Sequence, residues 1–593
     1  MCGIAVILPG GAVDVPPFAI DRMAAALRHR GPDEQASLRL PGCHLGHTRL
    51  SVIDPESGQQ PMSDPTGRYT VVFNGEVYNH RDLRRQLERE ERAVFHTRCD
   101  TEVLLHGYAA WGRGVLSRLN GQFAFAIWDS LDRELFVARD RFGEKPLYWA
   151  RTAAGDVLVA SEIKAILASG LVKPRLDLVS VDAYLGLYYV PPDRSIYENV
   201  HPVRPGTAAM FRGGDDGVET WRYWSPQHSV HDVDEAEAAA HVRLLLEKAV
   251  ERQTVADVPV GAFLSGGLDS STIVALMARQ AGARNVSTFS VGFGDLIDEL
   301  PFARDVAAAY GTDHHEMQMD IDVAAMLDRM THVYDEPFGD SSNIPTYLVS
   351  QYARRGVKVV LSGDGGDEIF GGYDWYRGLL ASAPGASASA IWEHHVAGAT
   401  GMTADRSGLW SPRPAPPSLR ALRETYSMPH AGMDAAAAFD VACYLPGDIL
   451  AKVDRAAMAH GLETRSPFLD VELTEFVLGL PWQMRFASDS SRDARGTGAS
   501  PVLKHLLRRA CEDLWPSSVR TRGKQGFGAP VRHWLTLPSV AAMWGRVTKD
   551  HSPLLSLLPG LRAAEQREQL RPQRKWSLLC LGLWLESQGA AHA

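Results

Sequence analysis

Several features are missing from this sequence, and each absence narrows the class of protein. No apolar run is long enough to span a bilayer, so we expect no transmembrane helix and no membrane partner. The first apolar stretch is short and lacks a basic start, so we expect no secretory signal peptide. The six cysteines are scattered without a CxxC pair, which argues against a disulfide framework or a zinc site. We therefore expect a cytoplasmic protein with free thiols.

An excess of basic charge is also absent. The chain has 61 Lys and Arg against 71 Asp and Glu, a net charge of −10, which argues against nucleic acid as a partner. Hydrophobic residues make up 45% and charged residues 22%, as in soluble globular proteins. With 593 residues the chain is too long for one core, so we expect at least two domains.

The pattern of apolar residues changes along the chain. Residues 1–190 contain short strand-like runs mixed with helical spacing, which predicts a mixed α/β domain. Residues 191–234 are rich in Pro, Gly and turn signals and are expected to be a linker. Residues 235–593 alternate helical and strand-like segments at their start, which predicts a doubly wound parallel sheet.

The sequence Ser265-Gly266-Gly267-Leu268-Asp269-Ser270-Ser271 is the sharpest motif. It follows an apolar strand and opens a predicted helix. The glycines allow the backbone to approach a phosphate, and the helix N-terminus supplies N–H donors. No lysine follows the glycines, so this is not a loop built to transfer a γ-phosphate. The motif resembles the pyrophosphate loop of ATP pyrophosphatases, with a plain strand-to-helix turn as the alternative reading.

A second glycine-acid motif, Ser362-Gly363-Asp364-Gly365-Gly366-Asp367-Glu368, also follows a strand. Carboxyl ends of neighbouring parallel strands meet at one edge of a sheet, where ligands bind. Asp269 and Asp367 are therefore candidate ligands for Mg²⁺, which prefers carboxylates together with phosphate oxygens. Asp364 is a candidate for orienting or deprotonating groups at an adenylate. An acidic surface turn is the alternative reading.

Cys2 is a candidate nucleophile. If Met1 is removed, Cys2 carries a thiol and a free α-amine, whose ordinary pKa of about 7.7 to 8.0 allows it to accept the thiol proton. Asn74 and Gly75 follow a predicted strand and can form an oxyanion hole through a side-chain amide and a backbone N–H. Arg49 can bind a carboxylate, and Glu76 with Asp100 can receive an α-ammonium group. Together these groups describe hydrolysis of glutamine, although surface salt bridges explain Arg49 or Asp100 taken singly.

A glycine-flanked lysine, Lys524, can close over a charged reaction centre and neutralise it. Lys452, on a predicted helix, supports the same site or lies on a solvated helix face. These two alternatives stay open from the sequence.

Taken together, the motifs closely resemble those of glutamine-hydrolysing asparagine synthetases of the bacterial class B type. The resemblance covers nearly the whole chain and includes MCGI, RGPD, RLSVID, NGEVYN, RDRFGEKPLYW, SGGLDSS, SGDGGDEIFGGY and KVDRAAMAHGLETRSPFLD. It implies an αββα N-terminal-nucleophile glutaminase domain, then an ATP-pyrophosphatase synthetase domain. It also implies an internal path for ammonia and a homodimer.

The resemblance assigns residues by matching motif. The catalytic set it implies is Cys2, Asn74, Gly75, Asp364 and Lys524. The glutamine-binding set is Arg49, Leu50, Ser51, Val52, Ile53, Asn74, Gly75, Glu76 and Asp100. The set for ATP and pyrophosphate is Leu264, Ser265, Gly266, Gly267, Asp269, Ser270, Val291, Ser362 and Gly363. Asp269 and Asp367 are the implied Mg²⁺ ligands.

Two departures from the family pattern concern the acceptor. The best-known members have Glu where this chain has Asp364, and some aspartate-using members have an arginine where Ser341 to Asn343 stand. The expected reaction is amidation of aspartate to asparagine through an acyl-AMP, with ATP and glutamine. The alternatives are amidation of another carboxylic acid in natural-product biosynthesis, with glutamine or another nitrogen donor, and a non-catalytic relative that binds nucleotide and glutamine.

Overall fold

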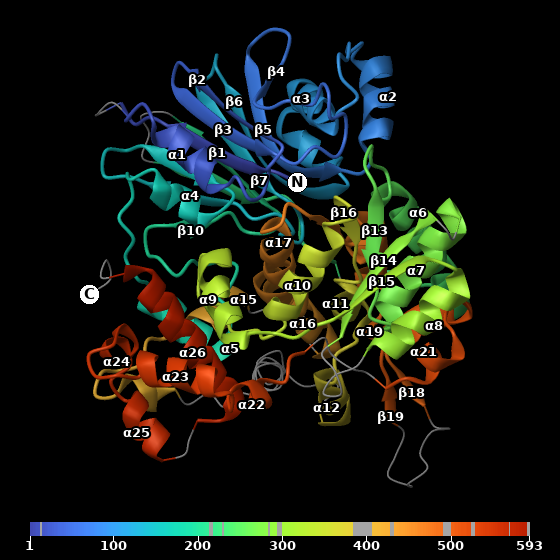
Figure 1. Cartoon of the computed structure of the whole chain (residues 1–593). Helices are drawn as coiled ribbons and strands as arrows, with labels where there is room; N and C mark the ends of the chain where they lie inside the picture. The colour runs from blue at the N-terminus through green and yellow to red at the C-terminus, as the bar shows by residue number, and fades with distance from the viewer. Residues whose placement is uncertain are drawn as a thin grey trace.

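The computed structural model describes most of the chain. The described residues are 1–11, 15–212, 217–227, 230–282, 285–292, 299–382, 406–426, 432–489, 500–523, 528–567 and 570–589. The first part of the chain forms the upper body in Figure 1, and the parallel sheet and the remaining helices form the lower body. The N-terminus lies at the junction between the two. Among the described residues, no helix combines the length and apolar character needed to cross a membrane.

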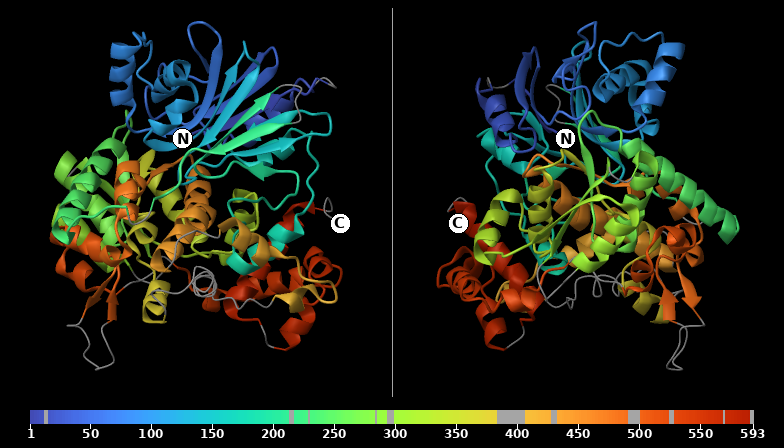
Figure 2. Two further views of the ribbon diagram at one scale, coloured as in Figure 1. Left: turned by 180° about the vertical axis from the view of Figure 1, so that it is seen from behind. Right: turned by 45° about the vertical axis from the view of Figure 1, so that its right-hand side comes forward.

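Two six-stranded antiparallel sheets form the N-terminal part. The first has the order β10 (His201–Pro202), β8 (Tyr148–Arg151), β9 (Val157–Ala160), β1 (Gly3–Leu8), β3 (Cys43–Arg49) and β2 (Glu34–Leu40). The second has the order β12 (Val218–Arg222), β11 (Thr207–Arg212), β7 (Glu134–Arg139), β6 (Gly121–Asp129), β5 (Tyr69–Val77) and β4 (Met62–Ser63). Figure 2 shows these sheets stacked within the upper body.

Strand β1 shows why these sheets stack. All six of its residues are buried, because both of its faces are covered. Ile4, Val6 and Leu8 share one core with residues of the second sheet, including Trp128. Ala5 and Ile7, on the opposite face, pack with helices α1 (Ala19–Ala26) and α4 (Ile163–Ala168).

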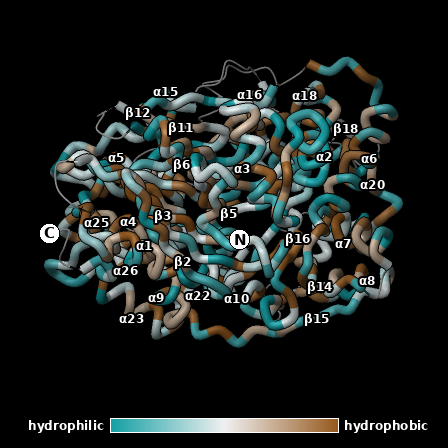
Figure 3. The backbone as a smooth tube through the Cα atoms, turned by 90° about the horizontal axis from the view of Figure 1, so that it is seen from above, coloured by the Kyte–Doolittle hydropathy of each residue, from teal (hydrophilic) through white to brown (hydrophobic). Residues whose placement is uncertain are grey.

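The outer face of the second sheet is covered in the same way. Its apolar residues pack with α2 (His80–Glu90) and α3 (Asp100–Trp111). The remaining surface of α2 is charged, and this helix is mostly hydrophilic in Figure 3. The layers are therefore helix, sheet, sheet and helix, which confirms the expected N-terminal fold.

The segment 191–234 requires a correction. It was expected to be a linker, but it contributes β10, β11 and β12 to the two sheets. Strand β11 pairs with β7 through Ala208 to Arg212, and four of its six residues are buried. The turn residues that surround these strands dominate the composition of the segment and hide their short apolar runs.

The C-terminal part is built on a five-stranded parallel sheet. Its order is β15 (Asp313–Gln318), β14 (Ser287–Gly292), β13 (Val260–Phe263), β16 (Val359–Leu361) and β17 (Glu463–Arg465). One face packs against α6 (Glu235–Gln253), α7 (Leu268–Ala281) and α8 (Leu300–Tyr310). The other packs against α10 (Asn343–Ala353) and α17 (Leu450–Met458). This is the doubly wound arrangement that the alternation of helices and strands predicts.

Strand order reverses between β13 and β16. From β13 the chain proceeds to β14 and β15 on one side, and it then returns to form β16 and β17 on the other. The crevice at such a reversal is the usual ligand site of open α/β sheets. The two glycine-acid motifs follow the two strands that flank it.

The remaining helices complete the lower body, and those near the C-terminus form a group of their own away from the sheet. They are α5 (Leu178–Leu187), α9 (Val323–Val333), α11 (Gly366–Phe370), α12 (Trp375–Ser382), α14 (Ser407–Trp410), α15 (Ser418–Tyr426), α16 (Gly432–Phe439), the π-helix Asp440–Ile449, α18 (Val471–Gly479), α19 (Trp482–Arg485), α20 (His505–Cys511), α21 (Ser517–Thr521), α22 (Val531–Trp534), α23 (Pro538–Val547), α24 (Pro553–Leu557), α25 (Leu561–Gln566) and α26 (Pro572–Ser587). A two-stranded ribbon, β18 (Ala487–Asp489) and β19 (Ser500–Val502), lies beside them. One apolar core contains residues of β1, α1, α5, α9 and α26, so the two halves pack as one body.

Candidate active sites

Cys2 lies directly before β1, at the junction of the two halves, and is only 7% exposed. Its backbone N–H donates a hydrogen bond to Asn74 Oδ1 at 2.9 Å. Burial raises the pKa of the Cys2 thiol, although the nearby N-terminal ammonium and Arg49 act in the opposite direction. The thiol therefore needs a local base to become nucleophilic.

Strand β5 brings Asn74 and Gly75 next to Cys2. The Asn74 side-chain N–H₂ is buried and finds no acceptor among the described residues. A buried donor without a partner is costly unless a ligand accepts from it. At Gly75 an added Cβ would lie 2.1 Å from the carbonyl oxygen of Gln122, so only glycine fits there. This geometry suits an oxyanion hole.

Two acids lie beside this pair. Glu76 Oε2 accepts from Arg465 at 3.1 Å, while the buried Glu76 Oε1 finds no donor among the described residues. Burial and the neighbouring carboxylate of Asp100 hold the pKa of Glu76 well above its usual range. An ammonium group bound here would donate a hydrogen bond to Glu76 Oε1 and would stabilise the charged form of the Glu76 carboxylate.

The other residues assigned to glutamine have different roles in the structure. Arg49 donates to the carbonyls of Asp54 at 2.7 Å and Pro55 at 2.9 Å, so it holds the loop after β3. Leu50 and Val52 pack on Val359 of β16. The loop also contains Ser51, whose N–H donates to Asp33 at 2.8 Å, and Ile53, whose carbonyl accepts from Arg49 at 3.4 Å. The structure therefore places this loop beside Cys2. Its Leu50 and Val52 side chains pack at the interface with the C-terminal half.

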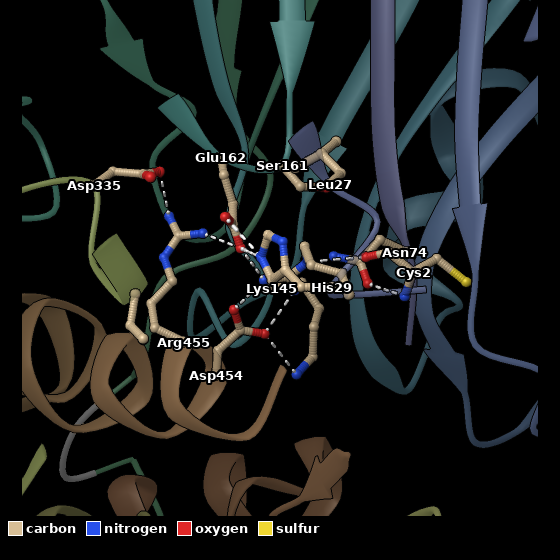
Figure 4. Close-up of polar contacts among 12 residues, drawn as sticks. Cys2, Leu27, His29, Asn74, Lys145, Ser161, Glu162, Asp335, Asp454 and Arg455 are labelled. Atoms are coloured by element: carbon tan, nitrogen blue, oxygen red, sulfur yellow. Dashed lines mark hydrogen bonds and ion pairs between the residues drawn. The ribbon is translucent and has the colours of Figure 1, made fainter. Parts of the chain in front are cut away.

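A buried charge network connects Cys2 to helix α17 of the other half (Figure 4). Arg30 donates to the carbonyl of Cys2 at 3.0 Å, to Glu162 at 2.7 Å and to both oxygens of Asp454 at 2.8 and 2.9 Å. Arg455 pairs with Glu162 at 2.7 Å. The sequence motifs contain Arg30, Asp454 and Arg455 but not Glu162, and their spacing does not reveal the pairing.

The second site is a cavity of about 980 Å³ at the reversal between β13 and β16. All residues assigned to ATP, pyrophosphate or Mg²⁺ line it, together with Asp364 and Lys452. Gly266 has φ +66°, and an added Cβ would lie 2.4 Å from Phe302 Cβ, so this turn requires glycine. The turn leads directly into α7, whose first N–H groups can receive an anion.

Asp364 lies at the end of β16 and accepts from the hydroxyl of Ser362 at 2.7 Å. Burial raises the pKa of Asp364, and Asp269 and Asp367 act in the same direction. A carboxylate whose pKa is raised by its surroundings is suited to accept a proton near neutral pH.

Lys504 was missed by the sequence analysis. Its ammonium lies between the two candidate Mg²⁺ ligands, 2.5 Å from Asp269 Oδ2 and 2.7 Å from Asp367 Oδ1. Two carboxylates that share one cation are close enough for a divalent ion to bridge them, and oxygen donors suit Mg²⁺. No group of three His, Cys, Asp or Glu that could hold a metal occurs in the described ranges, so phosphate oxygens would have to complete the shell.

Lys524 lies outside the described residues. Its neighbour in sequence, Arg522, lines the cavity and donates to the carbonyl of Ser265 at 3.1 Å and to Glu299 at 2.8 Å. For Lys452 the structure decides between the two readings, because this lysine is 7% exposed and faces the cavity rather than solvent.

Comparisons with known proteins identify the family of this chain. The asparagine synthase family model matches residues 241–586, and a glutamine amidotransferase domain model matches residues 1–224. The chain belongs to the glutamine-hydrolysing asparagine synthetase family. It is thus a ligase that combines a glutamine amidotransferase domain with a synthetase domain, in a family that uses ATP.

Three relatives illustrate the range of similarity. A putative glutamine-hydrolysing asparagine synthetase of Mycobacterium tuberculosis is 34% identical, over 98% of this chain and 97% of the relative. Asparagine synthetase 1 of Bacillus subtilis is 33% identical, over 87% of this chain and 84% of the relative. A protein of Gibberella zeae named an amidase is 29% identical, over 86% of this chain and 84% of the relative.

Proposed function

We propose that this enzyme amidates a carboxylic acid through an acyl-AMP, with glutamine as nitrogen donor and ATP as activating substrate. The first acceptor to test is aspartate, and the products are then asparagine, glutamate, AMP and pyrophosphate. The observation that carries this proposal is that the two glycine-acid loops and Asp364 line one cavity at the strand reversal.

In the glutaminase half-reaction, the Cys2 thiol attacks the side-chain amide carbon of glutamine. The α-amine exposed by removal of Met1 takes the thiol proton, because the structure offers no histidine bonded to Cys2 among its described contacts. The Asn74 N–H₂ and the Gly75 N–H stabilise the oxyanion. Glu76 and Asp100 hold the α-ammonium group. Ammonia leaves, and water then hydrolyses the thioester to release glutamate.

In the synthetase half-reaction, the acceptor carboxylate attacks the α-phosphorus of ATP and pyrophosphate leaves. The N-terminus of α7 and the Ser265 to Ser270 loop bind the phosphates. Mg²⁺, held by Asp269 and Asp367, would neutralise phosphate charge. Ammonia then attacks the acyl carbon and AMP leaves, while Asp364 accepts a proton from the attacking nitrogen.

The two sites are separated by the buried interface that contains Arg30 and Asp454. We propose that ammonia crosses this interface inside the protein, where bulk water does not protonate it. The boundaries between the functional domains fall, in this proposal, after β12 and before α6.

The experiment that tests the proposal measures AMP and pyrophosphate released from ATP and Mg²⁺, with glutamine as donor and aspartate as the only acceptor. Aspartate-dependent turnover with asparagine formed supports the full proposal. Glutamine hydrolysis without aspartate-dependent pyrophosphate supports the second candidate, a different acceptor acid. Two observations favour that second candidate: the stretch Ser341 to Asn343 stands where some aspartate-using members have an arginine, and one relative is named an amidase.

A further inference from the structure

The nucleotide cavity includes a lobe formed by helices α5 and α26. Leu187 and Tyr188, at the end of α5, line this lobe together with Arg571, Gln573 and Arg574, at the start of α26. These five residues form what we term the distal lobe. The two helices lie next to each other in the lower body of Figure 1. None of the five residues belongs to a motif that the sequence analysis singled out.

Hydrogen bonds connect the distal lobe to the reacting end of β16. The N–H of Gly339 donates to the carbonyl of Tyr188 at 2.7 Å. The next residue, Asp340, pairs with Lys452 at 2.8 Å, and the charge of Asp364 acts on Lys452 in turn. A short chain of contacts therefore leads from Asp364, where the acceptor is activated, to Tyr188. A ligand longer than the small acid at Asp364 can extend into the lobe.

Tyr188 has an unusual backbone conformation for an aromatic residue. Its φ is +71°, in the left-handed region that glycine favours. Its N–H donates to the carbonyl of Tyr184 at 2.8 Å, and the Tyr184 hydroxyl donates to the carbonyl of Ser577 in α26 at 2.7 Å. Residues held in such conformations cluster at ligand sites. Here the conformation keeps a half-buried ring in the cavity wall.

The charge of the distal lobe is positive. Burial raises the pKa of Tyr188 to about 12, and the guanidinium groups of Arg574 and Arg571 act in the opposite direction, so both lie near this phenol. The phenol is therefore neutral near pH 7 and adds no negative charge. Arg571 makes no ion pair and no side-chain hydrogen bond with any residue that the structure describes.

Arg571 differs in this respect from other cations of the cavity. Each of three others pairs with a carboxylate at 2.5 to 2.8 Å, namely Lys452, Lys504 and Arg522. A second anionic group on a ligand would have to displace one of these partners, whereas Arg571 can accept an anion without such an exchange. The planar guanidinium group suits a carboxylate or a phosphate.

We propose that the distal lobe binds a second anionic group of an elongated acceptor, so that the enzyme amidates one end of a long dianionic acid. Leu187 and the ring of Tyr188 contact the chain of this acid, and Arg571 with Arg574 binds its far anion. The inference rests on the proposed function, because it concerns the acceptor of the same reaction. It favours an acceptor longer than aspartate.

The first experiment compares acids of equal length that differ in the far carboxylate. Calorimetric titration of the full-length enzyme measures the Kd of suberate against octanoate and of succinate against butyrate. We expect suberate to bind about 10-fold more tightly than octanoate, because charge-assisted hydrogen bonds are the strong ones. A third titration with 8-phosphonooctanoate shows whether the far group is better met as a carboxylate or as a phosphate. Equal or tighter binding of octanoate overturns the inference.

The second experiment substitutes Arg571→Gln. We expect the preference for suberate over octanoate to disappear, and Arg571→Lys to retain part of it. The matched control is Lys575→Gln, which removes one positive charge from the same helix. The ammonium of Lys575 lies over the Trp544 ring, 4.8 Å from its centroid, and does not line the cavity. Glutamine hydrolysis by each sample reports that the chain is folded. A preference that survives Arg571→Gln, or that Lys575→Gln also removes, overturns the inference.

Exchange of pyrophosphate into ATP separates failure of this inference from failure of the proposed function. With suberate as acceptor, we expect Arg571→Gln to lower kcat/KM for exchange about 10-fold. Exchange that is faster with aspartate than with suberate overturns the inference and leaves the acyl-AMP step intact. No exchange with any of these acids, combined with Arg571-dependent binding of suberate, overturns the acyl-AMP step and with it the assignment of the lobe to the acceptor.

Discussion

The two candidate sites of this chain are built in opposite ways. Around Cys2 nearly every polar group is buried, and orphaned atoms on Asn74 and Glu76 already mark where a ligand must donate or accept. The nucleotide site is a wide cavity whose central acids, Asp269 and Asp367, are held by the ammonium of Lys504. The first site already offers unpaired buried atoms, whereas in the second the carboxylates are engaged with an internal cation.

The largest effect is expected from a substitution at Cys2, which should inactivate one site and leave the other active. Cys2→Ala should abolish glutamine-dependent amide formation, by about 10⁴-fold or more, because no other thiol is at this position. Synthesis with free ammonia should continue, since the cavity is untouched. Glutamate release and amide formation, measured in the same assay, check both halves of this prediction. Full glutamine-dependent activity in the variant would disprove the role of Cys2.

Removing the Asn74 side-chain donor, which has no acceptor among the described residues, should have the next largest effect. Asn74→Ala deletes one oxyanion donor and should lower kcat for glutamine hydrolysis about 10²- to 10³-fold. The control is pyrophosphate exchange at the other site, which should stay within about twofold of the parent. A comparable loss at both sites would indicate that the substitution disturbs the fold rather than the oxyanion.

A substitution at Lys504 should affect the cavity and leave the Cys2 site unchanged. Lys504→Met removes the ammonium group that bridges Asp269 and Asp367, so we expect nucleotide-dependent exchange to fall about 100-fold. Lys504→Arg keeps the charge and should lose less. Glutamine hydrolysis should remain near the parental rate in both variants. Unchanged exchange in the methionine variant would show that the lysine has no part in holding these acids for the nucleotide.

The interface between the sites can be broken at Asp454. Burial disfavours its charge, but Arg30 and Lys145 outweigh this, so its pKa lies below the usual value. The folded pKa is thus lower than the unfolded one, and the stability contributed is present above about pH 4 and lost as the pH falls below it. Asp454→Asn should lower the free energy of unfolding at pH 7 by about 3 to 5 kcal/mol.

Urea unfolding at pH 7 and at pH 3.5 measures the free energy of unfolding of the parent and of the Asp454→Asn variant. The difference in this free energy between the two proteins should be smaller at pH 3.5. A constant difference would mean that the charge of Asp454 does not supply the stability.

The smallest effect is expected at an exposed pair across the same interface. Lys358 donates to Asp33 at 2.8 Å, and both side chains are about a quarter exposed, at 27% and 26%. Lys358→Met should therefore change the free energy of unfolding by less than about 1 kcal/mol. Glutamine hydrolysis should stay within about twofold. A larger loss would show that this pair, and not only the buried network, holds the two halves together.

Local chemistry explains which parts of the fold could be predicted. The continuous apolar run of β1 and the spacing of apolar residues in the helix Leu300–Tyr310 are clear signals in the sequence itself. Strand β17 carries none, since two of its three residues are the charged Glu463 and Arg465. Its extended form depends on pairing with β16, which is a tertiary contact.

In the candidate sites, too, residues with a local sequence signal were predicted and residues that depend on tertiary contacts were not. Motifs indicated the residues of the nucleotide cavity because each loop follows its own strand, and strand ends meet at a known edge. They did not indicate the bond between Arg30 and Asp454, which lie 424 positions apart. Lys504 was missed for the same reason, because no neighbour in sequence signals a ligand there.

Helix α17 has a consequence for how such enzymes can be recombined. Within four consecutive residues it presents Lys452 to the nucleotide cavity and Asp454 with Arg455 to the glutaminase side. At 1.5 Å per residue these side chains are fixed on one rigid rod and cannot be repositioned independently. A glutaminase half taken from a relative would have to bring its own matching Arg30 and Glu162. The two halves are therefore expected to be inherited and exchanged as a pair.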